Sequence, residues 1–154
     1  MNKNDLIKLL DGIFSPLGFK RKGNNWLLNG EQLSKIVNIQ RSSYSNAFYI
    51  NYGYIIRALP LLNVRMHVEN RLASTSKIEQ KRITNLLDFE IGINKEKRLA
   101  ELKVIITEKI VAQMQSINIE EELLNELRQR SHLNDISLIV KRHFNLQEEE
   151  EGEE

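Results

Sequence analysis

Four charged or ionisable side chains alternate along one stretch of the sequence. Arg65, His67, Glu69 and Arg71 recur at every second position, which places them on one face of a β-strand. On that face His67 could act as a general base, with the Glu69 carboxylate orienting its ring. The same spacing also describes the solvated side of a sheet, where charges pair across strands. We expect no catalytic residue in this row and interpret it as part of a binding surface.

Three amide side chains from neighbouring strands are expected to extend this row. Asn38 and Gln40 share one face of their strand because they are two residues apart, and Asn51 lies in the next strand. Asparagine is depleted in strands, so these amides are less expected on a surface that is merely solvated. The candidate site is therefore a polar sheet face that hydrogen-bonds a ligand or partner. Its predicted residues are Asn38, Gln40, Asn51, Arg65, His67, Glu69 and Arg71.

A second candidate cluster is basic. Lys20, Arg21 and Lys22 follow Phe19 and precede Trp26. These lysine and arginine side chains could contact phosphates or a partner protein, with the Trp26 indole stacking on a base. The alternative is an edge strand whose lysines deter pairing with other sheets, with the tryptophan in the core. We favour the edge strand and keep the nucleic-acid or partner contact as the second interpretation.

Other chemistries lack the residues that they need. The chain has no cysteine, which excludes disulfides, thiolate metal sites and cysteine nucleophiles. The histidines at positions 67, 132 and 143 have no metal-ligand spacing. The glycines are isolated, with neither a phosphate loop nor the turn that presents a serine nucleophile. We therefore expect no metal, no cofactor and no enzymatic activity.

The elements that position these residues are a sheet followed by helices. Apolar periodicity predicts an N-terminal helix at 4–15 and then strands at 19–22, 26–28, 33–41, 48–56 and 64–72. Helical periodicity returns at 78–88, 94–116, 118–127 and from 134 onward. Gly53, in the middle of a strand, indicates a bulge or a close backbone approach. The expected class is α+β, with an antiparallel sheet of four or five strands packed on one face by the C-terminal helices.

The formal net charge of +1 conceals an uneven distribution of charge. Residues 1–88 carry a net charge of +7, residues 89–146 are balanced, and residues 147–154 carry −6. Six glutamates in that tail repel one another and bury nothing, so we expect disorder there and a single domain over 1–146. No secretory signal and no membrane span are visible in the sequence. We expect a cytoplasmic protein without a membrane partner.

Several short motifs in the first half resemble a known family. They are Leu17-Gly18-Phe19-Lys20-Arg21-Lys22-Gly23-Asn24-Asn25-Trp26, then Val37-Asn38-Ile39-Gln40-Arg41-Ser42, then Phe48-Tyr49-Ile50-Asn51-Tyr52-Gly53, and last His67 and Arg71-Leu72. In this order they resemble the bacterial domain-of-unknown-function 4304 family, over roughly residues 5–130. The resemblance implies an α+β fold with an antiparallel sheet and packed helices. It implies no established activity, and the acidic tail lies outside it.

Three functions remain open at this point. The leading hypothesis is a protein-binding module without catalysis, specifically a cytosolic immunity or antitoxin protein that neutralises a bacterial toxin, with the polar face or the acidic tail opposing the toxin surface. The second is nucleic-acid binding, which requires the basic residues to gather on one face. The third is an enzyme with a polar site on the sheet, which requires a closed pocket holding His67 and Glu69.

Overall fold

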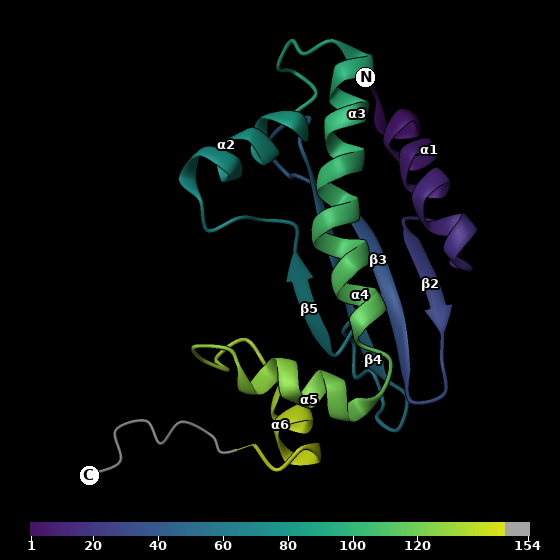
Figure 1. Ribbon diagram of the computed structural model, residues 1–154, viewed down its shortest axis with the longest axis vertical. Helices are drawn as coiled ribbons and strands as arrows, with labels where there is room; N and C mark the ends of the chain where they lie inside the picture. The colour runs from purple at the N-terminus through teal and green to yellow at the C-terminus, as the bar shows by residue number, and fades with distance from the viewer. Residues whose placement is uncertain (147–154) are drawn as a thin grey trace.

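The computed structural model describes residues 1–146 and shows a five-stranded sheet with helices packed against it (Figure 1). Helix α1 (Lys3–Phe14) comes first and runs into a 3₁₀ turn. The strands are β1 (Lys20–Lys22), β2 (Asn25–Asn29), β3 (Leu33–Arg41), β4 (Phe48–Ile56) and β5 (Val68–Arg71). The later helices are α2 (Lys77–Leu86), α3 (Lys95–Ile106), α4 (Ala112–Ser116), α5 (Glu120–Arg128) and α6 (Leu138–His143). The predicted α+β class is confirmed, and the acidic tail, where we expected disorder, lies outside the described residues.

Each strand of the sheet pairs antiparallel with its neighbour along the chain, in the order β1-β2-β3-β4-β5. Strands β3 and β4 have the predicted bounds, but β5 begins at Val68 rather than at residue 64. Before β5, Leu62 and Asn63 adopt left-handed backbone conformations with φ of 51° and 71°. They form a turn in which the Val64 N–H donates to the Leu61 carbonyl at 3.2 Å, and the chain reaches β5 through a loop over residues 57–67.

Alternate residues of the strands point to opposite faces of the sheet. One register row joins Trp26, Val37 and Tyr52, which are all buried. Helices α1, α3 and α4 lie over this face, and α5 crosses one end of it (Figure 1). Asn70 interrupts the apolar row on β5, and its Oδ1 accepts a hydrogen bond from Arg130 Nη2 at 2.8 Å. The next register row is polar and faces away from the helices.

A π-helical turn, Thr107–Val111, joins α3 to α4 where the sequence predicts one continuous helix. Four almost fully buried apolar residues of this segment recur at every fourth position, namely Leu102, Ile106, Ile110 and Met114. An α-helix makes one turn in 3.6 residues, so each step of four residues rotates the stripe about 40° too far. A π-turn closes its hydrogen bond one residue later than an α-turn. It therefore corrects the rotation and keeps the stripe against the sheet.

Gly53 allows β4 and β5 to approach each other closely, as its position in mid-strand predicts. A β-carbon at this position would lie 1.8 Å from the Val68 carbonyl oxygen and 2.9 Å from Met66 Sδ. No side chain fits in that space, because the Val68 carbonyl belongs to the backbone of the neighbouring strand β5. Only glycine is compatible with this pairing.

The last helix begins later than the sequence predicts, at Leu138 instead of Asn134. Residues 134–137 form a turn in which the Ile136 N–H donates to the Leu133 carbonyl at 3.0 Å. None of the helices within residues 1–146 is both long enough and apolar enough to cross a membrane.

Candidate functional site

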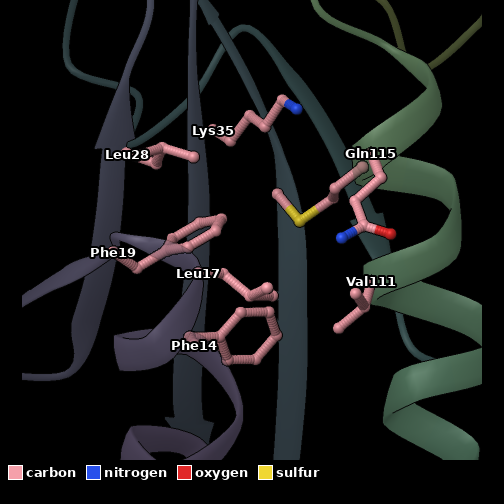
Figure 2. A pocket seen from close by; sticks show the side chains of 8 residues that line it. Phe14, Leu17, Phe19, Leu28, Lys35, Val111 and Gln115 are labelled. Atoms are coloured by element: carbon pink, nitrogen blue, oxygen red, sulfur yellow. The ribbon is translucent and has the colours of Figure 1, made fainter.

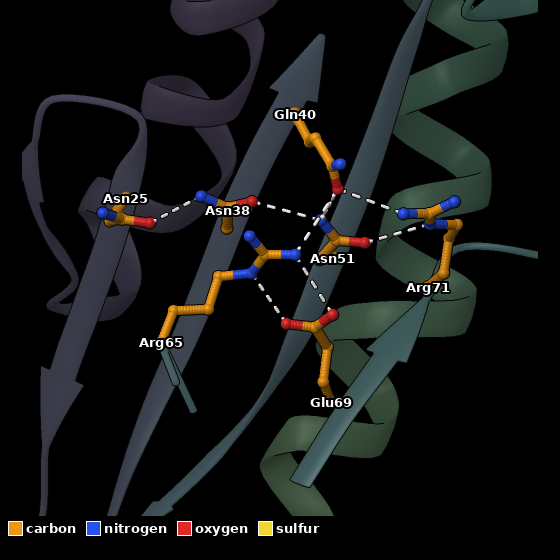
Figure 3. A network of polar contacts seen from close by, with 7 residues as sticks. All are labelled: Asn25, Asn38, Gln40, Asn51, Arg65, Glu69 and Arg71. Atoms are coloured by element: carbon orange, nitrogen blue, oxygen red, sulfur yellow. Dashed lines mark hydrogen bonds and ion pairs between the residues drawn. The ribbon is translucent and has the colours of Figure 1, made fainter. Parts of the chain in front are cut away.

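A row of polar side chains crosses the sheet on the face opposite the helices (Figure 3). The strand register places Lys22, Asn25, Asn38, Asn51 and Arg71 side by side on five successive strands. Directly opposed side chains on antiparallel strands are close enough to interact. Asn38 is 8% exposed and Asn51 is fully buried, so their amides need hydrogen-bond partners within the protein.

The amide side chains form a series of hydrogen bonds with one another, and the series ends at Arg71. Asn38 Nδ2 donates to Asn25 Oδ1 at 2.7 Å, and Asn51 Nδ2 donates to Asn38 Oδ1 at 3.1 Å. Arg71 Nε donates to Asn51 Oδ1 at 3.1 Å. Both polar atoms of the buried Asn51 therefore have partners, and the series fixes the orientation of the Arg71 guanidinium.

Gln40 joins this series of amides to a second arginine. Its Oε1 accepts from Asn51 Nδ2 at 3.0 Å and from Arg71 Nη2 at 3.0 Å. A third donor, Arg65 Nη2, lies at 3.4 Å. Arg65 also forms a bidentate pair with Glu69, with distances of 2.7 Å from Nε to Oε1 and 3.1 Å from Nη2 to Oε2. The structure thus brings together six of the seven predicted site residues.

Arg71 carries a positive charge that no carboxylate of the network pairs with. Its guanidinium carbon lies 3.9 Å from the centre of the exposed Tyr49 ring, which is cation–π geometry. Within residues 1–146 no carboxylate oxygen lies within 4.0 Å of this guanidinium. Since Glu69 neutralises Arg65, the Arg71 charge faces solvent in a fixed position.

His67 does not join the network, although its spacing predicted that it would. It precedes β5 and is buried. Its Nδ1 accepts from the Ile56 N–H at 2.8 Å, and its Nε2 lies 2.8 Å from the Pro60 carbonyl oxygen. A ring that accepts at Nδ1 can donate from Nε2, so both nitrogens hold the loop. The pairing of His67 with Glu69 as base and orienting group is not formed.

The other histidines also have structural partners. His143 Nε2 lies 2.7 Å from Glu120 Oε1, and His132 Nδ1 accepts from the Asn134 N–H at 3.4 Å. Among the residues that the structure describes, no cluster of His, Asp and Glu side chains is placed to hold a metal ion.

The basic cluster is divided between the two faces of edge strand β1. Lys20 and Lys22 pair with residues on the polar face, whereas Arg21 points to the helix side, 3.6 Å from Asp11 Oδ1. Trp26 is fully buried and donates from Nε1 to Asp11 Oδ1 at 2.8 Å. Because its indole packs in the core, Trp26 cannot stack on a base. This part of the nucleic-acid interpretation is therefore wrong.

The remaining basic residues of the first 88 positions are spread over several surfaces. Lys8 lies on α1, Lys81 lies on α2, and Lys35 points from β3 toward the helices. Others lie on the polar face of the sheet. The described residues therefore do not show the single basic face that the nucleic-acid hypothesis requires.

An exposed apolar loop leads directly into the polar face. Leu61, Leu62 and Val64 are exposed, Leu62 by 64%. The left-handed conformation of Leu62 is costly for a residue with a β-carbon, and such conformations concentrate at functional segments. Arg65 directly follows Val64 in the sequence, and its guanidinium hydrogen-bonds to Glu69 and Gln40 of the network. We call residues 61–64 the apolar loop.

Two residues of the network were not among the predicted site residues. The sequence places Asn25 in the turn after β1, whereas the register pairs it with Asn38. Tyr49 precedes Asn51 by two positions, so the alternation that identified Asn51 also places Tyr49 on the same face. Alternation along β4 could therefore have identified Tyr49 as a residue of this face. Asn25 could be identified only from the pairing of β2 with β3.

These observations define an antiparallel α+β protein with a hydrogen-bonded polar network on the sheet face that lies opposite the helices. The family model of a domain of unknown function, DUF4304, matches residues 10–129. The chain therefore belongs to this family, as the motifs of its first half predicted, and helix α6 lies beyond the match. No curated protein and no solved structure matches the chain.

Proposed function

We propose that this protein is a non-catalytic binding module whose polar sheet face and apolar loop hold another protein. We propose further that it acts as an immunity or antitoxin protein that neutralises a bacterial toxin. The observation that carries the proposal is the network that holds Arg71 against Tyr49 without a carboxylate partner in residues 1–146. Arginine and tyrosine side chains often dominate the energy of protein interfaces.

Preorganisation supports this role. Ordering a flexible side chain at an interface costs about 0.5–1.5 kcal/mol. Two hydrogen bonds from Arg71, to Asn51 and Gln40, already hold the guanidinium before any partner arrives. A partner carboxylate can pair with its remaining N–H groups at a smaller entropic cost.

The chemistry of the face selects the partner. Arg71 is a fixed cation without a carboxylate partner within residues 1–146, so this edge of the sheet favours an acidic group. The exposed Leu62 and Val64 favour an apolar contact next to it. The expected partner surface is therefore a carboxylate flanked by apolar side chains on a folded toxin domain.

The proposal expects a toxin gene beside the gene of this protein, and the test uses the product of that gene; a neighbourhood without a toxin gene would count against the immunity function. Growth is measured in cells that produce the toxin with and without this protein, and affinity is measured between the purified pair. Leu62→Asp and Arg71→Gln alter the proposed surface. Val104→Asp is the matched control, because Val104 is an exposed apolar residue on α3.

We expect the wild type and the Val104→Asp variant to restore growth. Leu62→Asp and Arg71→Gln should each weaken binding by about tenfold or more, which corresponds to about 1.4 kcal/mol. Folded variants that bind as tightly as the wild type would refute the surface. Failure of the wild type to bind or protect would refute the immunity function. Salt-dependent binding to a random oligonucleotide would favour the nucleic-acid alternative instead.

A further inference from the structure

A small apolar pocket lies on the helix side of the sheet, apart from the polar face (Figure 2). It opens between the end of α1, strands β2 and β3, and the helical segment 111–115. Its lining residues are Phe14, Leu17, Phe19, Leu28, Lys35, Val111, Met114 and Gln115. The enclosed space is about 80 Å³, and the pocket opens to solvent at its mouth. An apolar cavity of about 150 Å³ binds benzene, so the enclosed space holds only a few methylene groups and the rest of a longer ligand lies in the mouth.

One charged side chain, Lys35, borders this apolar space. Its Nζ donates to Asn118 Oδ1 at 2.6 Å. Within residues 1–146 no carboxylate oxygen lies within 4.0 Å of this nitrogen. Burial lowers the pKa of the Lys35 ammonium, and the more distant carboxylate of Glu122 opposes that effect. A half-buried cation without an adjacent anion is poorly solvated, and an anion in the pocket would stabilise it.

The wall opposite β2 and β3 is built around the π-helical turn. Val111 is the last residue of that turn, and Gln115 follows one helical turn later. π-turns are rare and frequently occur at functional sites. The carboxamide of Gln115 lies across the pocket from Lys35 in Figure 2, beside Val111 on the helix wall.

We propose that this pocket binds a small monocarboxylate with an apolar body. The carboxylate pairs with the Lys35 ammonium, and the apolar body packs against Phe14, Phe19 and Val111. Pockets of this kind combine an apolar lining with a few polar groups that fix the ligand's orientation. Here the single cation selects an anion over a neutral or a cationic molecule of the same shape.

The test uses octanoate as the probe, because its alkyl chain is long enough to fill the enclosed space and extend through the mouth of the pocket. Octanol and octylamine have similar tails and differ in the charge of the head group. Binding to the full chain is measured by calorimetry and by shifts in the amide resonances of Val111 and Gln115. Lys35→Met removes the ammonium and keeps the apolar stem. Lys8→Met, at an exposed site on α1, removes the same charge away from the pocket.

We expect octanoate to bind at least about tenfold more tightly than octanol and octylamine, with shifts at Val111 and Gln115. Lys35→Met should reduce the octanoate affinity about tenfold, whereas Lys8→Met should leave it unchanged. If Lys35→Met does not fold, as judged by Trp26 fluorescence, Lys35→Gln replaces it with the same expectation. The proposal is overturned if octanoate does not bind, if the three probes bind alike, or if folded Lys35 variants bind octanoate as the wild type does.

Discussion

Replacing Asn51 by leucine removes the centre of the polar network with little change in side-chain volume. Asn51 is fully buried and makes three hydrogen bonds, to Asn38, Gln40 and Arg71. Arg71 and Gln40 keep each other as partners in the variant, because Arg71 Nη2 donates to Gln40 Oε1. The largely buried Oδ1 of Asn38 loses its donor.

The expected loss of stability follows from these contacts. A hydrogen bond between neutral groups contributes about 1 kcal/mol, and one to a charged group contributes about 1.5–3 kcal/mol. Two neutral bonds and one charged bond are lost in Asn51→Leu, so the free energy of unfolding should fall by about 3 kcal/mol once the burial of leucine is allowed for. For a protein of this size that corresponds to a fall in Tm of roughly 6–12 °C.

Urea unfolding followed by Trp26 fluorescence measures this change, because Trp26 is the only tryptophan and is fully buried. Asn4→Leu, at an exposed position on α1, is the matched control and should change stability by less than about 0.5 kcal/mol. The double variant Asn38→Leu/Asn51→Leu should cost less than the sum of the single variants, because it leaves no orphaned Asn38 oxygen. A stability equal to that of the wild type for Asn51→Leu, or strict additivity in the double variant, would refute the reasoning.

Three further predictions concern the core and the helix layer. Arg98→Met should lower the free energy of unfolding by about 3 kcal/mol in the same urea assay, because the buried guanidinium donates to four backbone carbonyls around the end of α2. Gly53→Ala should cost about 3 kcal/mol or more, with amide hydrogen exchange in β5 strongly increased, because the added carbon meets the Val68 carbonyl. Arg82 hydrogen-bonds Glu101 and holds the pKa of that carboxyl below its usual range. The carboxylate therefore stabilises the fold at neutral pH and loses this effect as the pH falls through its folded pKa. Glu101→Gln should be slightly less stable than the wild type at pH 7 and equally stable well below about pH 4, as urea titrations at both pH values would show.

The sheet could be predicted from sequence because its central strands carry two regular signals at once. Leu33–Arg41 and Phe48–Ile56 alternate apolar and polar residues, and polar turns separate them. The same alternation placed Asn38, Gln40 and Asn51 on one face, and the register confirms that placement. In a regular strand, the face on which a side chain lies depends only on whether its position is odd or even, and the sequence shows this directly.

The position of His67 could not be predicted, because alternation of faces holds only within a strand and His67 lies just before β5. The apolar and polar alternation of residues 64–67 continues that of β5, so the sequence does not show that the strand begins only at Val68. The apolar pocket was also beyond sequence analysis. Phe14, Lys35 and Val111 come from three elements that meet only in the folded chain.

The two proposed sites lie on opposite faces of one strand, and this separates their tests. On β3, Lys35 points toward the helices, whereas Asn38 and Gln40 point toward the polar face. Lys35 and Asn38 are three positions apart in the strand, which is an odd number, so alternation alone requires opposite directions. Lys35→Met should therefore leave toxin binding unchanged, and Arg71→Gln should leave octanoate binding unchanged. A variant that loses both activities would indicate damage to β3 itself, and unfolding measured by Trp26 fluorescence would reveal that damage independently.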